Sequence, residues 1–271
     1  MPITLEEVSE RKREEPQKKV PQNPFQQQRN SAEENLSRVK RVVAVHSGKG
    51  GVGKSTFCAN LAATLAKMGF KTGVLDADVD CPSCHKLFGL KERVAADKAG
   101  RMIPKEAFGV KVLSVGNLVD DEAKANVMRG PIMFKLINDM LSNAEWGELD
   151  YLIIDLPPGT GDNPLTIMQV APLNGLIIVT QPQELAFADA KKSVDMAKKL
   201  NVQVLGLAEN MSGEIFGSRG EKLSDELGVG FLGSIPLDAK IRKASDEGKP
   251  FVLADEKLFE LFRQIVYEAG L

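Results

Sequence analysis

The chain has 271 residues, of which 43% are hydrophobic and 27% charged, a balance typical of globular proteins. Its 35 Lys and Arg side chains nearly match its 37 Asp and Glu side chains, which excludes a generally basic protein that binds nucleic acid. Three cysteines are too few for a disulfide-stapled secreted fold, and no apolar run approaches the roughly 20 residues that span a bilayer. The N-terminus also lacks the pattern of a signal peptide, so we expect a cytoplasmic protein without nucleic-acid or membrane partners.

The composition changes near residue 40. Residues 1–39 are rich in charged side chains, glutamine and proline, so they bury too little apolar surface to offset the entropy of ordering. We therefore expect a polar, disordered tail at 1–39, followed by one domain at 40–271. A docking arm anchored by Leu5, Val8 and Phe25 is the alternative interpretation of the tail.

From residue 40 onward, apolar strand-like runs alternate with segments of helical periodicity. The expected strands cover residues 41–46, 71–75, 110–115, 151–154, 176–180, 202–207 and 230–235. The expected helices cover residues 54–68, 131–141, 186–200 and 256–269. Continuous Val, Ile and Leu runs separated by helices indicate an α/β fold, with a doubly wound and mostly parallel sheet covered on both faces. Ligands of such sheets bind beyond the carboxyl ends of the strands.

Residues 48–56 match G-x-x-x-x-G-K-[ST], the phosphate-binding P-loop, between an expected strand and an expected helix. Glycines let consecutive backbone N–H groups curl around phosphate oxygens, and the helix N-terminus adds its positive dipole end. We expect Lys54 to reach the β- and γ-phosphates and the Ser55 hydroxyl to bind Mg²⁺. The nucleotide-binding residues of this loop are then Gly48, Gly50, Gly51, Val52, Gly53, Lys54, Ser55 and Thr56.

Carboxylates follow two other expected strands, and they should face the same crevice as the P-loop. Asp76 and Asp78 follow one strand, and Asp155 ends another in the Walker B arrangement. We assign Asp155 to the Mg²⁺ shell, because a carboxylate suits a hard cation, and we give Asp76 a structural or outer-shell role. Residues 157–161, Pro-Pro-Gly-Thr-Gly, form a turn that we name the switch loop, since it can change course when a γ-phosphate is present.

A second lysine inside the P-loop, Lys49, resembles the deviant Walker A group of P-loop ATPases, which includes MinD, ParA and the nitrogenase iron protein. The resemblance implies a homodimer in which Lys49 crosses the interface to the partner's nucleotide. It also implies that Asp78, the second Asp of D-x-D, orients the attacking water. The expected catalytic residues are therefore Lys49, Lys54 and Asp78.

Further motifs resemble the Mrp/ApbC family of MinD-like ATPases. They lie at residues 128–131, 146–151, 155–162, 181–185, 205–212 and 233–238. Members of that family carry iron–sulfur clusters to apoproteins and hydrolyse ATP slowly as homodimers. The resemblance implies the same activity here, with cluster donors or recipients as partners, and it implies that Asn210 hydrogen-bonds the adenine.

The cysteines depart from the family pattern. Typical members carry C-x-x-C between the Glu-Asn-Met-Ser strand end and Ile-Phe-Gly, where this chain has only Gly213 and Glu214. A different C-x-x-C, from Cys81 to Cys84, follows the D-x-D carboxylates. Two subunits meeting face to face would bring four thiolates together, the ligand set of a [4Fe–4S] cluster or zinc. A redox pair and simple packing of small side chains are the other interpretations.

Three functions remain open from the sequence. The first is a slow, homodimeric ATPase of iron–sulfur cluster assembly, with ATP and Mg²⁺ and a cluster at Cys81 and Cys84. The second is a metal-free positioning or regulatory ATPase of the MinD or ParA type. The third is a degenerate paralogue that binds ATP and partners but no cluster. We expect His46 and Cys58 to be packing residues at the end of the first strand and on the first helix.

Overall fold

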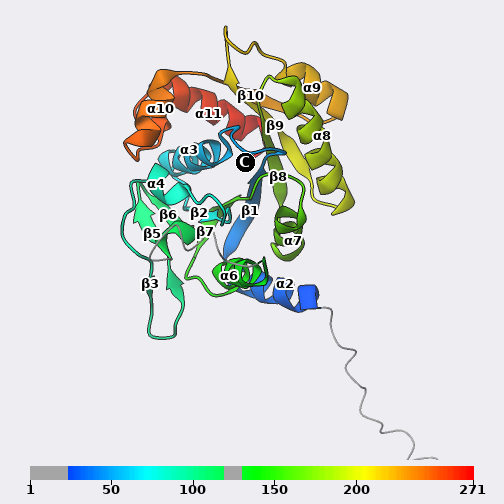
Figure 1. Ribbon diagram of the computed structural model, residues 1–271. Helices are drawn as coiled ribbons and strands as arrows, with labels where there is room; N and C mark the ends of the chain where they lie inside the picture. The colour runs from blue at the N-terminus through cyan, green and yellow to red at the C-terminus, as the bar shows by residue number, and fades with distance from the viewer. Residues whose placement is uncertain (1–23, 119–129) are drawn as a thin grey trace, which may run out of the picture.

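The computed structural model describes residues 24–118 and 130–271 of the chain (Figure 1). Within these residues the central sheet has eight strands in the order β10-β9-β8-β1-β7-β2-β6-β5. All neighbouring strands in it are parallel except the edge pair β5 and β6, and β3 and β4 form a separate antiparallel pair. The strands are β1 (Val39–His46), β2 (Thr72–Asp76), β3 (Ala95–Ala96), β4 (Met102–Ile103), β5 (Lys105–Ala107), β6 (Val110–Ser114), β7 (Leu149–Asp155), β8 (Gly175–Thr180), β9 (Val204–Ser212) and β10 (Phe231–Pro236).

Helices cover both faces of the sheet, and Figure 1 shows the two layers. One layer contains α3 (Lys54–Lys67), α4 (Cys84–Leu87), α10 (Ala239–Asp246) and α11 (Glu256–Glu268). The other contains α2 (Pro24–Asn35), α6 (Gly130–Ser142), α7 (Asp162–Val170), α8 (Glu184–Lys199) and α9 (Gly220–Leu227).

The central strands read as unbroken apolar runs because both of their faces are buried. In β1, Val43 and Val45 pack beneath α3 and α11, whereas Val42 and Ala44 pack beneath α6 and α7. The expected doubly wound, mostly parallel α/β fold is confirmed. Sequence periodicity missed α7, α9 and α10, which are short helices of eight or nine residues.

Part of residues 1–39, the segment for which the sequence predicts a solvated tail, is folded against the domain. Helix α2 lies in this segment and packs against α6 and α7. Ala32 and Leu36 are buried there, and the ring centroids of Phe25 and Phe134 are 6.1 Å apart. These apolar side chains share one side of the helix. The overall composition of residues 1–39 is polar, so composition alone does not reveal so narrow an apolar stripe.

Some sequence features fall outside the described residues. They include the proposed anchors Leu5 and Val8 and residues 128 and 129 of the 128–131 motif. Among the described helices, none combines the length and the apolar composition that crossing a bilayer requires.

Candidate active site

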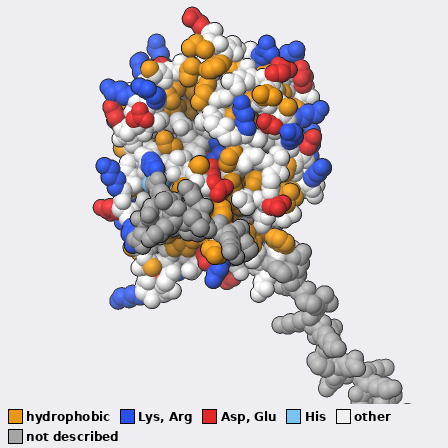
Figure 2. Space-filling view, viewed as in Figure 1, with side chains coloured by type: hydrophobic (Ala, Val, Ile, Leu, Met, Phe, Trp, Pro, Cys, Tyr) orange, Lys and Arg blue, Asp and Glu red, His pale blue; other side chains and the backbone are white. Residues whose placement is uncertain are grey.

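A cleft of about 710 Å³ opens where β1, β2 and β7 end. Asp155 is in register with Asp76 of β2 on one side and with Val45 of β1 on the other, so the three strands end at one level. The P-loop, the segment after β2 and the switch loop line this cleft. Figure 2 shows acidic side chains (red) near the centre of the same face.

The P-loop glycines are required by backbone geometry and by close contacts. Gly51 and Gly53 have φ angles of +79° and +84°, which side chains bearing a Cβ rarely adopt. A Cβ on Gly53 would also collide with the Asn210 amide, and one on Gly48 would collide with the backbone carbonyl of Asp189. The loop therefore packs tightly against neighbouring segments and leads directly into α3 at Lys54.

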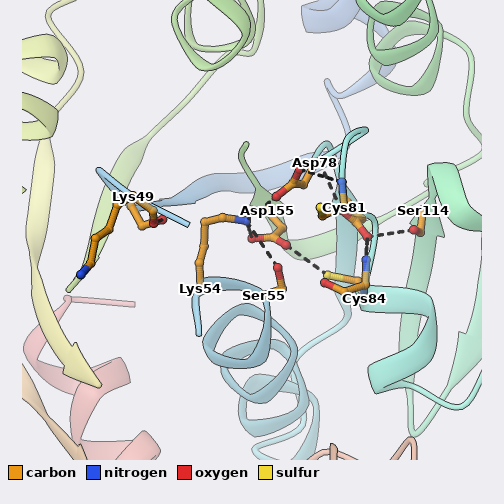
Figure 3. A network of polar contacts seen from close by, with 11 residues as sticks. Lys49, Lys54, Ser55, Asp78, Cys81, Cys84, Ser114 and Asp155 are labelled. Carbon is orange, nitrogen blue, oxygen red and sulfur yellow. Dashed lines mark hydrogen bonds and ion pairs between the residues drawn. The ribbon is translucent and has the colours of Figure 1, made fainter. Parts of the chain in front are cut away.

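Lys54 joins the two carboxylate segments. Its Nζ lies 2.7 Å from Asp155 Oδ1 and 3.4 Å from Asp78 Oδ2. Figure 3 shows the Lys54 side chain extending towards Asp155. Burial lowers the pKa of Lys54, but the charges of Asp155 and Asp78 outweigh burial and hold the pKa above its usual value. The ammonium group is therefore charged and fixed at the base of the cleft, where phosphate oxygens can replace the carboxylates as its partners.

Asp76 organises the segment that follows β2. Its Oδ2 accepts hydrogen bonds from the backbone N–H groups of Ser83 and Cys84, both at 2.9 Å, and from the Ser114 hydroxyl at 2.8 Å. Its Oδ1 accepts from the backbone N–H of Asp78 at 3.2 Å. Burial and the charge of Asp155 raise the pKa of Asp76 to about 7 despite these donors. The contacts agree with the structural role expected for Asp76.

The oxygen ligands around Lys54 fit a small hard cation. The Ser55 hydroxyl, 3.4 Å from Lys54 Nζ, and the Asp78 carboxylate line the cleft, while Asp155 is fully buried behind Lys54. Such oxygen donors suit Mg²⁺, which usually keeps several waters and takes only one or two carboxylates. The carboxylates of Asp76 and Asp155 and the Cys84 thiol also lie within 4.8 Å of one another. That group is enclosed, and Asp76 Oδ2 in it already accepts three hydrogen bonds.

Lys49 and Asn210 stand apart from the Lys54 cluster. Lys49 points away from Lys54 in Figure 3, and its Nζ donates to Gln183 Oε1 at 3.0 Å on the surface. The Asn210 Nδ2 donates to the backbone carbonyl of Val52 at 2.8 Å, which ties the end of β9 to the P-loop.

The structure separates the two cysteines of the C-x-x-C. Cys81 is exposed and lines the cleft, whereas Cys84 is buried at the start of α4 and donates to Asp155 Oδ2 at 3.5 Å. A hydrogen bond with Cys58, together with burial, holds the pKa of the Cys84 thiol well above its usual range. The expectation that both thiols share one accessible ligand site is therefore not met. The backbone contacts of Asp76 with this turn direct Cys84 inward.

Sequence reasoning missed Ser114, which ends β6 and donates to Asp76. Its position at the end of an apolar run was a usable signal, but strand order was needed to place β6 beside β2. Cys58 is buried, as expected for a packing residue, although its contact with Cys84 was not foreseen.

Residues 38–269 match the family model of ParA described as NUBPL iron-transfer P-loop NTPase. The chain belongs to this family of iron-transfer P-loop NTPases. Membership confirms the resemblance to cluster carriers that the motifs indicated.

Individual members of the family are close in sequence. An iron-sulfur cluster carrier protein of Methanocaldococcus jannaschii is 49% identical over 246 residues, covering 86% of this chain and 85% of the relative. A protein of the same description from Pseudomonas fragi is 46% identical over 233 residues, covering 81% of each chain.

Solved structures show the same architecture. A nucleotide-binding protein of Archaeoglobus fulgidus in complex with ADP superposes with a TM-score of 0.72 at 39% identity, covering 82% of this chain and 92% of that one. The cell-division ATPase MinD of Pyrococcus furiosus superposes with a TM-score of 0.70 at 23% identity, covering 86% and 99% respectively. The likeness to MinD shows a shared fold.

Proposed function

We propose that this iron-transfer P-loop NTPase is a homodimer that binds ATP with Mg²⁺ in the cleft, hydrolyses it slowly and carries iron–sulfur clusters to recipient proteins. The observation that carries the proposal is the buried Lys54 ammonium, paired with Asp155 and Asp78 at the base of a glycine loop. We place the protein in the cytoplasm, where ATP is abundant and a reducing environment keeps thiols free.

Nucleotide binding exchanges the partners of Lys54. Phosphate oxygens accept from the N–H groups of the P-loop and from the Lys54 ammonium, which then no longer needs Asp78 as its counter-ion. Asp78 lines the same cleft, so its released carboxylate can accept a hydrogen bond from a water placed in line with the γ-phosphate. Ser55 and Asp155 would hold Mg²⁺, which neutralises phosphate charge when it is bound.

The position of Lys49 supports a role between two copies. Its side chain leaves its own cleft and meets Gln183, two residues before Leu185, whose surface is 77% exposed. Light scattering tests this: we expect ATP to produce dimers of the Asp78→Ala variant, and Lys49→Ala added to that variant to abolish them. Dimers that persist in the double variant would contradict the role of Lys49.

The cargo assignment is supported by the family and by one exposed thiol, that of Cys81. Two copies facing each other across their nucleotides would bring together two Cys81 thiols, half of the four-thiolate set of a [4Fe–4S] cluster. Cys84 would complete the set only if the start of α4 opened and released its contacts with Asp76 and Asp155. A cluster bridged by Cys81 and Cys84 of two subunits therefore requires a rearrangement.

Anaerobic reconstitution with iron and sulfide tests the cargo. We expect about one cluster per dimer, detected by iron content and visible absorption, because the ligands come from both subunits. Cys81→Ser should abolish it, and Cys58→Ala is the matched control that should retain it. A wild-type protein that binds ATP but no iron would instead favour the metal-free nucleotide switch of the MinD or ParA type.

A further inference from the structure

His46 ends β1 immediately before the P-loop, and its side chain is fully buried. It points to the same face of the sheet as Ala44, towards α6 and α7. Within the described residues neither of its ring nitrogens has a hydrogen-bond partner. Burial, helped by the charge of Lys54, lowers the pKa of His46 to about 4, so the ring is neutral and carries one N–H donor at physiological pH. A buried unpaired donor is uncommon and calls for an explanation.

The switch loop runs alongside His46. The Leu156 N–H donates to the Val45 carbonyl at 3.0 Å, and the Gly159 N–H donates to the Ser47 carbonyl at 2.8 Å. These two hydrogen bonds bracket His46, and the residues between them on the other segment are Pro157 and Pro158. Proline has no N–H, so the backbone of the loop offers only carbonyl acceptors at this level.

Pro157 contributes to the walls of two cavities. It lines the nucleotide cleft, and it also lines an apolar cavity of about 410 Å³ beneath α6 and α7. The Pro157 carbonyl is the backbone group that His46 faces, but the contact falls short of a well-formed hydrogen bond. A small shift of the loop can therefore complete or abandon this contact without breaking close packing.

We infer that His46 is a positioning residue of the switch loop, whose imidazole N–H binds the Pro157 carbonyl when the loop closes on a γ-phosphate. The inference rests on the proposed ATP function. ADP offers no γ-phosphate to draw the loop in, so the imidazole remains unpaired in that state. A hydrogen bond made in only one nucleotide state favours that state, and His46 thereby increases the preference for ATP over ADP.

Substitutions at His46 separate this role from packing. His46→Met fills the space without a donor, whereas His46→Gln and His46→Asn keep an N–H near the positions of Nε2 and Nδ1 respectively. For each variant the affinities for ADP and a non-hydrolysable ATP analogue, kcat, KM and thermal stability without nucleotide are measured. We expect His46→Met to bind ADP normally and the ATP analogue about five- to tenfold more weakly, the usual worth of one hydrogen bond. One of the two amide variants should restore the preference.

The thermal stability of His46→Met without nucleotide also separates the two roles, because loss of a packing residue would lower the unfolding temperature. Because the imidazole is unpaired without nucleotide, His46→Met should leave the unfolding temperature unchanged or raise it. A His46→Met variant that keeps the wild-type ratio of ATP-analogue to ADP affinity would overturn the inference. Equal losses of stability and of affinity for both nucleotides would overturn it too. A wild-type protein that binds neither nucleotide would overturn the proposed function itself.

A measurement on the wild-type chain reports on the His46 imidazole directly. The chain has two histidines, so ¹⁵N-histidine labelling gives two imidazoles, and His46→Gln identifies the resonances of His46. We expect the ATP analogue, but not ADP, to shift the ring nitrogen of His46 in the direction of a new donated hydrogen bond. Identical His46 spectra in the two complexes would refute the inference.

Discussion

The P-loop at residues 48–56 and the C-x-x-C at residues 81–84 are both short motifs that follow a strand, yet they differ in the groups through which they would bind. A P-loop binds phosphate through backbone N–H groups. Their directions depend on backbone conformations that glycine adopts readily, so the positions of the glycines in the sequence already indicate them. The C-x-x-C would act through two side chains. The inward direction of Cys84 depends on the Asp76 carboxylate, which accepts from the backbone N–H groups of Ser83 and Cys84, whereas the Cys81 N–H donates to Asp78. A motif that acts through its backbone is therefore easier to interpret from sequence than one that acts through its side chains.

The largest effect on the P-loop site is expected from Lys54→Ala. We expect nucleotide binding to fall below detection, because the phosphates lose their buried cation. The variant should also lose about 3–5 kcal/mol of folding free energy, since the Asp155 carboxylate remains buried without a counter-charge. Calorimetric titration with ATP and urea unfolding measure the two effects.

The control removes both charges at once. Lys54→Met combined with Asp155→Asn should recover most of the stability but none of the nucleotide binding. ATP affinity in Lys54→Ala within tenfold of wild type would show that the cleft is not a P-loop site of the expected kind.

The next largest effect should come from Asp78. We expect Asp78→Asn to bind ATP yet to release phosphate at least about 10²-fold more slowly, because the attacking water loses its acceptor. Asp80→Asn is the matched control: Asp80 is exposed, lines the same cleft and should leave turnover within about twofold. Retained turnover in Asp78→Asn would remove the water-orienting role from this residue.

Thiol labelling tests whether Cys81 is accessible to solvent while Cys84 is not. With a small alkylating reagent at neutral pH, we expect one equivalent to react, at Cys81, while Cys58 and Cys84 react only in denaturant. Mass spectrometry of the digested protein locates the label, and bound ATP should slow the labelling of Cys81 in the cleft. Rapid modification of Cys84 in a Cys81→Ser variant would show that α4 opens readily, and would restore the paired site.

The last prediction concerns the pH dependence of stability. The folded-state pKa of Asp76, about 7, lies above its usual value of 3.8, so between these values the folded chain holds a proton that the unfolded chain releases. Asp76 should therefore make stability fall as pH rises from about 4 to 7, by at most about 1.4 kcal/mol per pH unit.

Asp76→Asn should remove this fall, which urea unfolding at several pH values measures in both proteins. The depressed pKa of His46 acts in the opposite direction, adding stability as pH rises from about 4 to 6.5, but both proteins share it and the difference cancels it. Parallel pH profiles for the two proteins would mean that the folded-state pKa of Asp76 is not raised.

Much of the nucleotide site could be predicted because its parts are contiguous. The P-loop, Asp155 at the end of β7 and the apolar strands are each complete within about ten residues, and a parallel sheet brings strand ends to one edge. Helix α2 could not be recognised in the same way. Its stabilisation comes from α6 and α7, which lie about 100 residues further along the chain, and not from its own composition.

A parallel α/β fold with a phosphate site follows from the sequence alone, since periodicity and glycine spacing are local properties of the chain. Which side chains meet depends on how the segments pack together. This packing placed Ser114 against Asp76, turned Cys84 away from Cys81 and towards Cys58, and brought His46 beneath the switch loop. A side chain's direction and partners depend on contacts between segments that are separate in sequence, and no local pattern encodes those contacts.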